Sequence, residues 1–468
     1  LMLKIFWNWL DDRAGIKQPL HNALSDPLPR KVGWAQVLGS GALFLIILQA
    51  ITGILLAMNY SASPDHAYDS LKYVTDQPFG KLIRGLHHHG SSALIVVVTL
   101  HMLRVFVFAA YKRPRELTWM IGILLFCLIL GFSFTGYLLP YDQKAYWATK
   151  VGIGFVHEVP WLGPYIQRIL QGGHSIGPPT LTRFYAIHVL ILPALLVPLI
   201  FIHLHLMRRK GEMPPWTEEF EEPSVRRTVP FYPFQLFRDT VFIALLFLAL
   251  LLITWHYGVP NEAPADTTAK NYLPRPEWYF LPLFEFEKLH INNFYFFGGN
   301  RVWIGTVLIP SIFITILLFL PFIDRNPSRL PRNRKLALTS ASIVVLFIIT
   351  LGVKAKVDTE NQKSTFPKAS AFEGTARLGE ELFATKGCYK CHRIDGKGGR
   401  IGPEFTPLHE NQNRHWTKEQ LIFILINPQE ALANGQNQVR MPSAQTIGLS
   451  LDQVDALADY LTKLKVVE

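Results

Sequence analysis

The chain has 468 residues, of which 49% are hydrophobic and 17% charged, with a mean hydropathy of +0.20. This composition excludes a disordered chain and argues against an ordinary soluble enzyme. The net charge of +11 would suggest nucleic-acid binding in a soluble protein, but the apolar excess favours charges placed beside a membrane. Three cysteines are too few for a disulfide framework.

The first 31 residues contain no clean apolar core, so the sequence predicts no cleavable signal peptide. Trp7 and Trp9 are followed closely by Asp11, Asp12 and Arg13. Aromatic residues beside charged ones are typical of an amphipathic helix on a lipid surface. We therefore predict a surface helix here, with membrane lipid as its partner.

Seven apolar stretches are long enough to cross a bilayer, which takes about 20 residues. They lie at residues 32–60, 87–110, 117–139, 187–207, 241–257, 302–323 and 336–353. The fifth and seventh are the shortest, but both have sharply polar flanks. The pattern predicts a multi-pass membrane protein.

The loops between these stretches carry charge unequally. One set holds 19 basic and 10 acidic residues, and it comprises residues 1–32, 111–118, 208–238 and 324–335. The other set holds 11 basic and 10 acidic residues, and it comprises residues 60–86, 140–186 and 258–301. Because basic loops stay in the cytoplasm, the N-terminus is expected inside a prokaryotic cytoplasmic membrane and the C-terminus outside.

The second and fourth spans each carry two histidines at nearly whole-turn spacing. His87 and His101 are 14 residues apart, about 40° short of four turns and about 21 Å along a helix. His188 and His203 are 15 apart, about 60° past four turns and about 22 Å. The two helices can therefore hold two stacked haem b groups, with one histidine from each helix per iron. A lone histidine would more often be a hydrogen-bonded polar residue, but two matched pairs favour haem ligation.

Glycines repeat the 14-residue interval of the first histidine pair. Gly39 and Gly53 lie in the first span, and Gly122 and Gly136 lie in the third. A glycine lets a flat macrocycle lie close to the backbone, although small-residue helix packing is the ordinary alternative. The shared interval favours contact with haem.

Two arginines accompany the histidines. Arg84 and Arg104 each lie three residues from a candidate ligand, and haem propionates would pair with both. His88 and His89 are turned about 100° and 200° away from His87, so we interpret them as flanking residues.

After residue 353 the chain becomes polar and then forms a small, separate helical domain. This domain contains Cys388-Tyr389-Lys390-Cys391-His392, the pattern of covalent haem c attachment. The two thiols add to the vinyl groups, and His392 ligates the iron. A CxxC alone could be a redox pair or half a zinc site, but no second CxxC follows.

The sixth position of the haem c iron requires another donor, for which Met441 is the candidate. It is the only methionine after Met213 and is followed by Pro442. A lone methionine in a small domain is usually part of the core. Its uniqueness and its distance from the cysteine motif favour ligation.

The expected fold is all-α: a seven-helix transmembrane bundle with a four-helix di-haem core, followed by a soluble α-helical cytochrome c domain. We divide the chain into a surface-helix region (1–31), a di-haem half (32–210), a three-helix second half (211–353), a linker (354–370) and the haem c domain (371–468).

These residues together resemble the cytochrome b subunit of quinol:cytochrome c oxidoreductases, over about residues 15–353. The motifs are Arg84–Gly90, Thr135–Gln143 and Pro276–Tyr279, the last being the PEWY motif of the outer quinol-oxidation site. Seven spans and the Arg208–Gly211 exit are similar to the plastoquinol-type branch, whose b subunit is split into two chains. Here the halves are fused, and the C-terminal domain resembles a class I cytochrome c.

The resemblance implies that quinol is oxidised on the outer side, between the segment after Tyr137 and PEWY. Glu277 is the expected proton acceptor, being a carboxylate in a mostly apolar loop. Tyr279 is expected to hydrogen-bond quinol or shape the pocket. The alternative for Glu277 is a solvated acid or an ion pair with Arg275.

The resemblance also implies a Q cycle. One electron passes to a Rieske iron–sulfur protein and on to haem c, and the other crosses through the two b haems to a quinone on the inner side. Arg208, Arg238 and Asp239 are the candidates there, against an alternative as lipid-headgroup or topology residues. With three cysteines, Cys127 and the two of the haem c motif, the chain cannot hold the iron–sulfur cluster. The Rieske protein is therefore expected as a partner, beside a downstream cytochrome c or oxidase, in a homodimeric complex.

The residues leave two other functions possible. One is a non-catalytic haem wire that passes electrons between other proteins. The other is a quinone-reactive membrane anchor for another respiratory enzyme. The PEWY segment favours the reductase, because a wire needs no proton acceptor beside a quinone pocket.

Overall fold

A computed structural model gives the fold. It describes residues 2–173, 175–215, 228–260, 262–267, 275–288, 303–364, 374–390, 392–394, 397–398, 404–407, 416–428 and 441–467. The chain forms two compact units, which are described separately. The first comprises Leu1–Ala265 and Pro274–Gly352, and the second consists mainly of the residues after Gly352.

The first unit begins with two short helices and then forms a helical bundle. Its first half contains α1 (Met2–Ala14), α2 (Lys17–Leu24), β1 (Pro27–Pro29), α3 (Val37–Ala57), α4 (Ala67–Asp76), α5 (Pro78–Val107), α6 (Glu116–Tyr137), α7 (Gln143–His157), α8 (Gly163–Gln171), α9 (Pro178–Ala186) and α10 (Leu192–Lys210). Its second half contains β2 (Thr228–Pro230), α11 (Phe231–Tyr257), α12 (Leu281–Glu287), α13 (Ile309–Ile323) and α14 (Lys335–Ser364). The predicted surface helix is α1, on which Trp7 and Trp9 are exposed.

Seven helices in the described residues are long and apolar enough to cross a membrane, which confirms the predicted number. They cover residues 34–57, 78–107, 116–137, 178–210, 231–257, 304–323 and 335–358. The fourth joins α9 and α10 through a π-helical turn at Ile187–Ile191. Several helices are longer than their apolar stretch, because polar residues at a membrane surface still satisfy their backbone by helical hydrogen bonds. Helix α14 ends at Ser364, so the first part of the segment predicted as a linker is helical.

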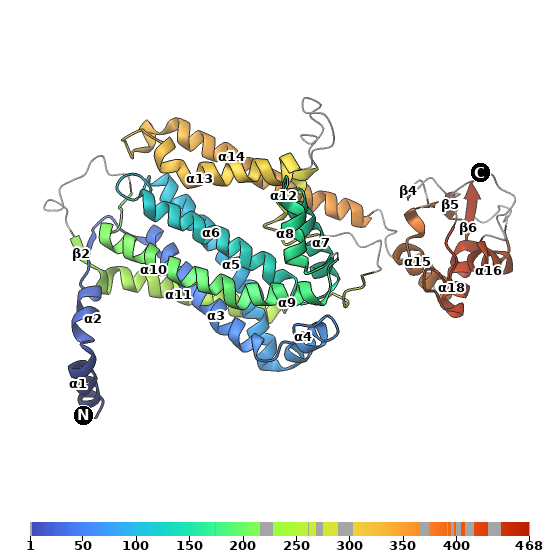
Figure 1. The fold of residues 1–468 in the computed structure, drawn as a ribbon, viewed down its shortest axis with the longest axis horizontal. Coiled ribbons are helices and arrows are strands. Elements are labelled where there is room, and N and C mark those ends of the chain that lie inside the picture. Colours follow the sequence, from blue (N-terminus) through green and yellow to red (C-terminus); the bar gives the residue numbers. More distant parts are fainter. Residues whose placement is uncertain are drawn as a thin grey trace. The chain divides into compact units, whose positions relative to one another are not determined.

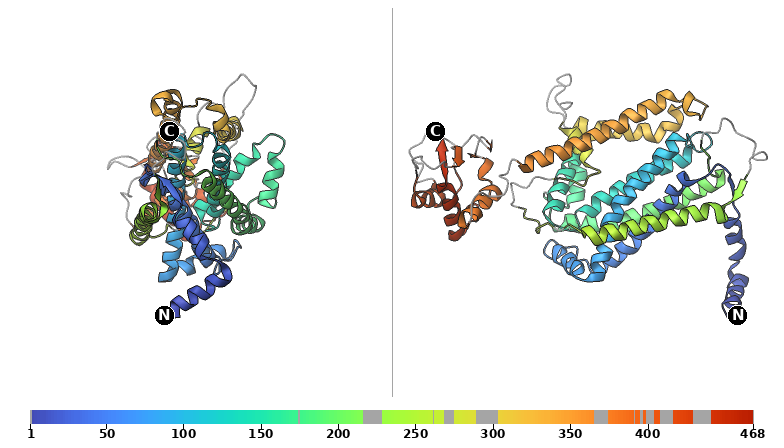
Figure 2. Two further views of the ribbon diagram at one scale, coloured as in Figure 1. Left: turned by 90° about the vertical axis from the view of Figure 1, so that its left-hand side faces the viewer. Right: turned by 180° about the vertical axis from the view of Figure 1, so that it is seen from behind.

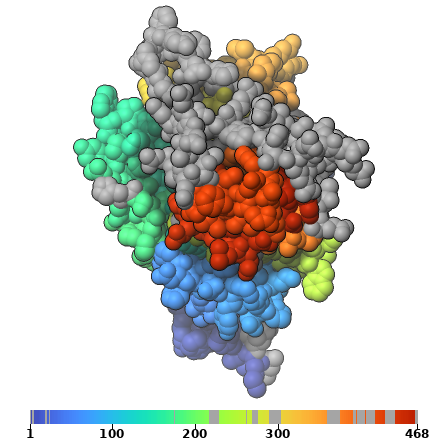
Figure 3. All heavy atoms as spheres, turned by 90° about the vertical axis from the view of Figure 1, so that its right-hand side faces the viewer, coloured from blue at the N-terminus to red at the C-terminus, as the bar shows by residue number. Residues whose placement is uncertain are grey.

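The bundle is built around α3, α5, α6 and α10. Helix α3 packs along α5, α10 packs along α6, and α11 contacts both α3 and α5 (Figures 1 and 2). Helix α13 lies against α6. The interior between α3 and α5 includes Leu45, Leu86 and Ile95, all nearly inaccessible to solvent. Figure 3 shows α4 (blue) and the α7–α8 region (green) at the surface at one end of this unit.

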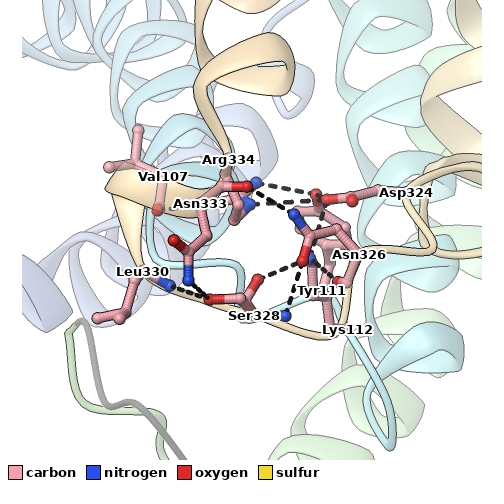
Figure 4. A network of polar contacts seen from close by, with 9 residues as sticks. All are labelled: Val107, Tyr111, Lys112, Asp324, Asn326, Ser328, Leu330, Asn333 and Arg334. Atoms are coloured by element: carbon pink, nitrogen blue, oxygen red, sulfur yellow. Dashed lines mark hydrogen bonds and ion pairs between the residues drawn. The ribbon is translucent and has the colours of Figure 1, made fainter.

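A polar network joins the α5–α6 connection to the α13–α14 connection (Figure 4). The Asp324 carboxylate accepts a hydrogen bond from the Tyr111 hydroxyl and forms an ion pair with Lys112 at 3.2 Å. Arg334 is fully buried, donates to Tyr111 Oη at 2.9 Å and to the Val107 carbonyl at 3.1 Å, and lies 3.6 Å from Asp324. The network therefore fastens the second half of the bundle to the first.

The carboxylate of this network has a perturbed pKa. Burial would raise the pKa of Asp324, but hydrogen bonds from Tyr111 and Lys112 and the charges of Lys112 and Arg334 outweigh it. The pKa of Asp324 therefore lies below its ordinary value of 3.8. A depressed carboxyl pKa stabilises the fold above the unfolded-state value and loses that contribution as the pH falls.

We expect Asp324→Asn to lower the stability at pH 7 by about 3 kcal/mol, because it leaves the buried Arg334 cation without its counter-charge. The difference from the wild type should shrink as the pH falls below about 4. Thermal loss of the circular-dichroism signal in detergent measures both effects. Asp76→Asn is the matched control, since Asp76 pairs with Lys72 on an exposed helix surface at 2.8 Å, and it should change stability by less than about 0.5 kcal/mol. Equal destabilisation by the two variants would contradict this role for Asp324.

The second unit has a helical core with short strands. It contains α15 (Thr375–Thr385), α16 (Lys418–Ile426), α18 (Leu451–Thr462) and the strands β3 (Arg393–Ile394), β4 (Lys397–Gly398), β5 (Glu404–Pro407) and β6 (Leu464–Val467). The strands are paired in the order β4-β3-β5-β6. Helices α15 and α16 both pack on α18, which begins after the capping side chain of Ser450. The unit remains predominantly α-helical, in agreement with the predicted fold class.

Candidate haem and quinone sites

Each of the four spanning histidines faces one of the four spaced glycines. The distance from the position of a hypothetical glycine Cβ to the histidine Cε1 is 3.4 Å for Gly39 and His101, 3.1 Å for Gly53 and His87, 3.3 Å for Gly122 and His203, and 2.6 Å for Gly136 and His188. A side chain at these positions would press against the imidazole. The glycines thus leave space beside the histidine rings, and a flat macrocycle would lie in that space.

The first histidine pair, His87 on α5 and His188 in the π-helical turn, lies face to edge. The ring centroids are 6.5 Å apart, with 70° between the ring planes. Two imidazoles that share one metal through bonds of about 2 Å have a similar centroid separation. Thr52 Oγ1 lies 2.9 Å from His87 Nδ1, and Thr135 Oγ1 lies 3.1 Å from His188 Nδ1. The two threonines orient the rings and leave each Nε2 for a ligand.

The sequence analysis did not predict these threonines. Each directly precedes one of the spaced glycines, as Thr52-Gly53 and Thr135-Gly136. The repeated Thr-Gly pair was the signal. The role of each threonine depends on which helix packs against it, and the local sequence does not specify that helix.

The second histidine pair, His101 on α5 and His203 on α10, has a cationic neighbour. Arg104 Nη2 lies 3.4 Å from His101 Nδ1. Arg104 Nε is buried and has no hydrogen-bond partner among the described residues. A buried guanidinium with an open donor fits an anionic group at this place, as a haem propionate would supply.

Arg84, near the other end of α5, is 7% exposed and donates to Thr75 Oγ1 at 2.6 Å. Asp142, which caps α7 by accepting from the Ala145 amide at 2.8 Å, interacts electrostatically with Arg84. The charge of Arg84 is therefore partly balanced by Asp142, and a haem propionate would be a second anionic partner. Of the flanking histidines, His89 lies 2.7 Å from the Gly258 carbonyl and ties α5 to the end of α11.

The PEWY segment lies against the start of α7 and the end of α6. Lys144 Nζ on α7 donates to Glu277 Oε1 at 2.8 Å, with side-chain exposures of 30% and 19%. The ammonium also lies 5.7 Å from the centre of the Tyr137 ring, whose hydroxyl donates to the Arg275 carbonyl at 3.3 Å. The structure thus brings Glu277 and Tyr137 together through a lysine that the sequence analysis did not single out.

Tyr279 lies on the inward side of the same segment. Its hydroxyl is hydrogen-bonded to Ser133 of α6, and its ring packs on the cluster between α3 and α5. Burial raises the pKa of Tyr279 well above its ordinary value, with the nearby Glu277 acting in the same direction. The phenol is therefore protonated and can donate a hydrogen bond.

The residues predicted for the inner quinone site lie in different environments. Asp239 is 8% exposed and accepts from Gln235 Nε2 at 2.9 Å. Arg238 Nη1 donates to the Val32 carbonyl at 3.1 Å, and Arg208 is exposed at the end of α10. The sequence analysis missed Glu212, whose Oε2 is buried without a hydrogen-bond partner in the described residues. Burial raises the pKa of Glu212 to about 7, against the opposing charge of Arg104.

In the second unit, the candidate haem c residues lie around one hydrophobic core. The His392 amide donates to the Cys388 carbonyl at 2.9 Å, and the His392 ring packs on Phe405 at 5.3 Å. Cys388 and Met441 both contact the core cluster built on α15, α16 and α18. Cys391 lies outside the described residues.

Comparison with known proteins identifies the parts of the chain. The model of the "Cytochrome b(N-terminal)/b6/petB" family matches residues 92–265, and "Cytochrome b(C-terminal)/b6/petD" matches residues 262–372. "Cytochrome b" of Cereibacter sphaeroides is 31% identical over 346 residues, covering 70% of this chain and 77% of that protein. The chain belongs to the cytochrome b family. The "Cytochrome c" family model matches residues 376–465, so this cytochrome b carries a fused cytochrome c domain.

Other relatives and a solved structure match different shares of the chain. "Menaquinol:cytochrome c reductase cytochrome b subunit" of Geobacillus thermodenitrificans is 41% identical and is covered over 98% of its length by 45% of this chain. "Cytochrome b/c1" of Bradyrhizobium diazoefficiens is 32% identical across 74% of this chain, which spans about half (49%) of that relative. A solved structure titled "Hyperthermophilic respiratory Complex III" matches with a TM-score of 0.67 and 27% identity, over 75% of this chain and 91% of that one. Membership of the two families implies haem b in the membrane unit and haem c in the C-terminal domain.

Proposed function

We propose that this cytochrome b is the core subunit of a membrane-bound quinol:cytochrome c oxidoreductase. The observation that carries the proposal is the cluster of Glu277, Tyr137 and Tyr279, with His88, the neighbour of His87 in the chain, facing Glu277. A carboxylate that faces a spanning helix beside a protonated tyrosine is suited to bind a quinol and take its proton. A passive electron wire needs neither group.

The four spanning histidines are proposed to hold two b-type haems. His87 and His188 would hold the outer one, and His101 and His203 the inner one. Gly39, Gly53, Gly122 and Gly136 would leave room for the macrocycles, while Arg84 and Arg104 would pair with propionates. Once bound, these haems would supply electron transfer across the membrane.

The C-terminal domain is proposed to hold one covalent haem c. Cys388 and Cys391 would attach it, and His392 and Met441 would ligate its iron. The contacts of Cys388, His392 and Met441 with a shared hydrophobic core support this assignment. By the charge asymmetry of the loops, the domain lies on the outer side of a prokaryotic cytoplasmic membrane.

At the outer site, oxidation of a quinol releases two protons and two electrons. The Glu277 carboxylate accepts one hydroxyl proton, and the protonated Tyr279 donates a hydrogen bond to the quinol oxygen. The Tyr137 ring, which lies 5.7 Å from the Lys144 ammonium, belongs to the same site. A Rieske iron–sulfur protein, supplied as a separate subunit, takes one of the electrons.

At the inner site, Asp239 and Arg238 are proposed to bind a quinone, with Arg208 at the entrance. Asp239 is a buried carboxylate and can deliver a proton as the quinone is reduced. Oxidation outside and reduction inside together build a proton gradient. A downstream cytochrome c or oxidase would receive electrons from haem c, within a homodimeric multi-subunit complex.

Purification of the native complex tests this function. We expect a pyridine haemochrome spectrum with two b haems per c haem, and quinol-dependent reduction of added soluble cytochrome c. A complex with that haem content but no quinol oxidation would instead be an electron wire or an anchor. A different haem ratio would overturn the ligand assignment.

A further inference from the structure

The ion pair between Lys144 and Glu277 joins two segments that are far apart in the chain. Helix α7 begins immediately after its cap, Asp142, and this turn directs Lys144 toward PEWY. The donor–acceptor distance is 2.8 Å, and both side chains are more than two-thirds buried. An ion pair shielded from water in this way is stronger than an exposed one.

The groups that face Glu277 come from several elements. Lys144 lies on α7 and His88 on α5, while Tyr279 belongs to the segment of Glu277 itself. The Tyr137 ring, at the end of α6, lies against the Lys144 ammonium. Lys144 is the cation that donates directly to the carboxylate, through Oε1. The Oε2 atom is then the oxygen that can accept a proton from a ligand.

We propose that Lys144 is a positioning residue of the outer quinol site, which holds the ionised Glu277 carboxylate toward the quinol and releases it after proton transfer. The inference rests on the proposed function and deepens it. When Glu277 accepts the proton, the hydroxyl O–H bond of the quinol breaks and an O–H bond forms on the carboxyl group. The two electrons would leave to the iron–sulfur protein and to the outer b haem, and the second hydroxyl proton of the quinol would leave to the outer aqueous side, so that the product is the neutral quinone.

The release follows from the change of charge. Ionised Glu277 and Lys144 attract each other as opposite charges, whereas the protonated carboxyl group offers only a neutral hydrogen bond. The carboxyl group can then turn away from Lys144 and carry its proton from the site. Lys144 thereby links the protonation of Glu277 to its orientation.

Steady-state kinetics of the assembled complex tests this role with Lys144→Met and Lys144→Arg. For Lys144→Met we expect kcat to fall about tenfold while KM for quinol changes by less than about twofold, because the carboxylate is misoriented but the quinol contacts remain. Lys144→Arg should restore most of the rate, because its guanidinium can donate to the Glu277 carboxylate as the ammonium does.

Lys72→Met is the matched control. Lys72 forms an ion pair of the same length, 2.8 Å, with Asp76 on the exposed surface of α4. The Lys72→Met variant should leave kcat at its wild-type value. Haem spectra of every variant verify assembly, and Lys144→Gln replaces Lys144→Met if the latter loses haem.

Combining Lys144→Met with Glu277→Gln separates the two proposals. If Lys144 acts through Glu277, the double variant should be no slower than Glu277→Gln alone. If Glu277→Gln impairs quinol oxidation but Lys144→Met keeps the wild-type kcat, the positioning role is overturned and the proposed function stands. If Glu277→Gln itself keeps the wild-type rate, the acceptor role in the proposed function fails.

Discussion

Replacement of His188 by leucine is expected to remove one of the two b-type haems and to abolish quinol oxidation. Leucine fills a similar volume but supplies no nitrogen to the iron, and His87, whose ring lies 6.5 Å away, would be left without its partner. The pyridine haemochrome ratio should fall from two b haems per c haem to one. The haem c signal serves as the internal standard, because the C-terminal domain forms a separate compact unit.

Two glycine variants supply a graded test of the same site. Gly136→Ala places a methyl group 2.6 Å from His188 Cε1, so the imidazole must move, and we expect partial loss or a shifted spectrum of one b haem. Gly131→Ala, on the same helix α6, is the matched control, because its methyl group would lie 3.8 Å from Leu192 Cδ2, an ordinary contact. Full retention of both b haems in His188→Leu would contradict the ligand assignment.

Glu277→Gln is expected to lower kcat for quinol oxidation by about 100-fold while leaving all haems bound. Glutamine keeps the shape of the side chain and can still contact Lys144, but it does not accept a proton at neutral pH. The haem spectra and the quinol-dependent reduction of cytochrome c are measured on the same preparation. A large fall in rate with unchanged haem content identifies a role in the reaction rather than in assembly.

The matched control for this variant is Glu381→Gln. Glu381 lies on α15, is 65% exposed and is 4.0 Å from Arg377 in a surface pair. It should leave the rate unchanged, since exposed ion pairs contribute little. Comparable loss in both variants would point to a general effect of removing negative charge and would contradict the acceptor role.

Much of the fold could be predicted from the sequence because its signals are local. A membrane-spanning helix is recognised by about 20 consecutive apolar residues, and seven such helices are present in the described residues. The histidine intervals of 14 and 15 residues carry a geometric meaning within one helix. The predicted limits were less accurate where polar residues continue a helix, as α14 does to Ser364.

The pairing of each histidine with its glycine was partly predictable. The shared 14-residue interval indicated that the first and third spans, which carry the glycines, pack beside the second and fourth, which carry the histidines. Which glycine faces which ring, and the hydrogen bonds from Thr52 and Thr135, required the packed helices. Helix rotation is set by all the neighbours of a helix together, and a single stretch of sequence does not encode it.

The sequence by itself determined the seven spans, the two histidine pairs and the haem c motif, because each depends on spacing within one segment. Only the tertiary structure decided the contacts between segments. Lys144 and Glu277 are 133 residues apart, and Tyr111 and Asp324 are 213 apart. Glu277 stands out in the sequence by its motif, but Lys144, Tyr111 and Asp324 carry no such signal. They acquire their roles when the folded bundle brings them together and excludes water, which strengthens each charge and hydrogen bond.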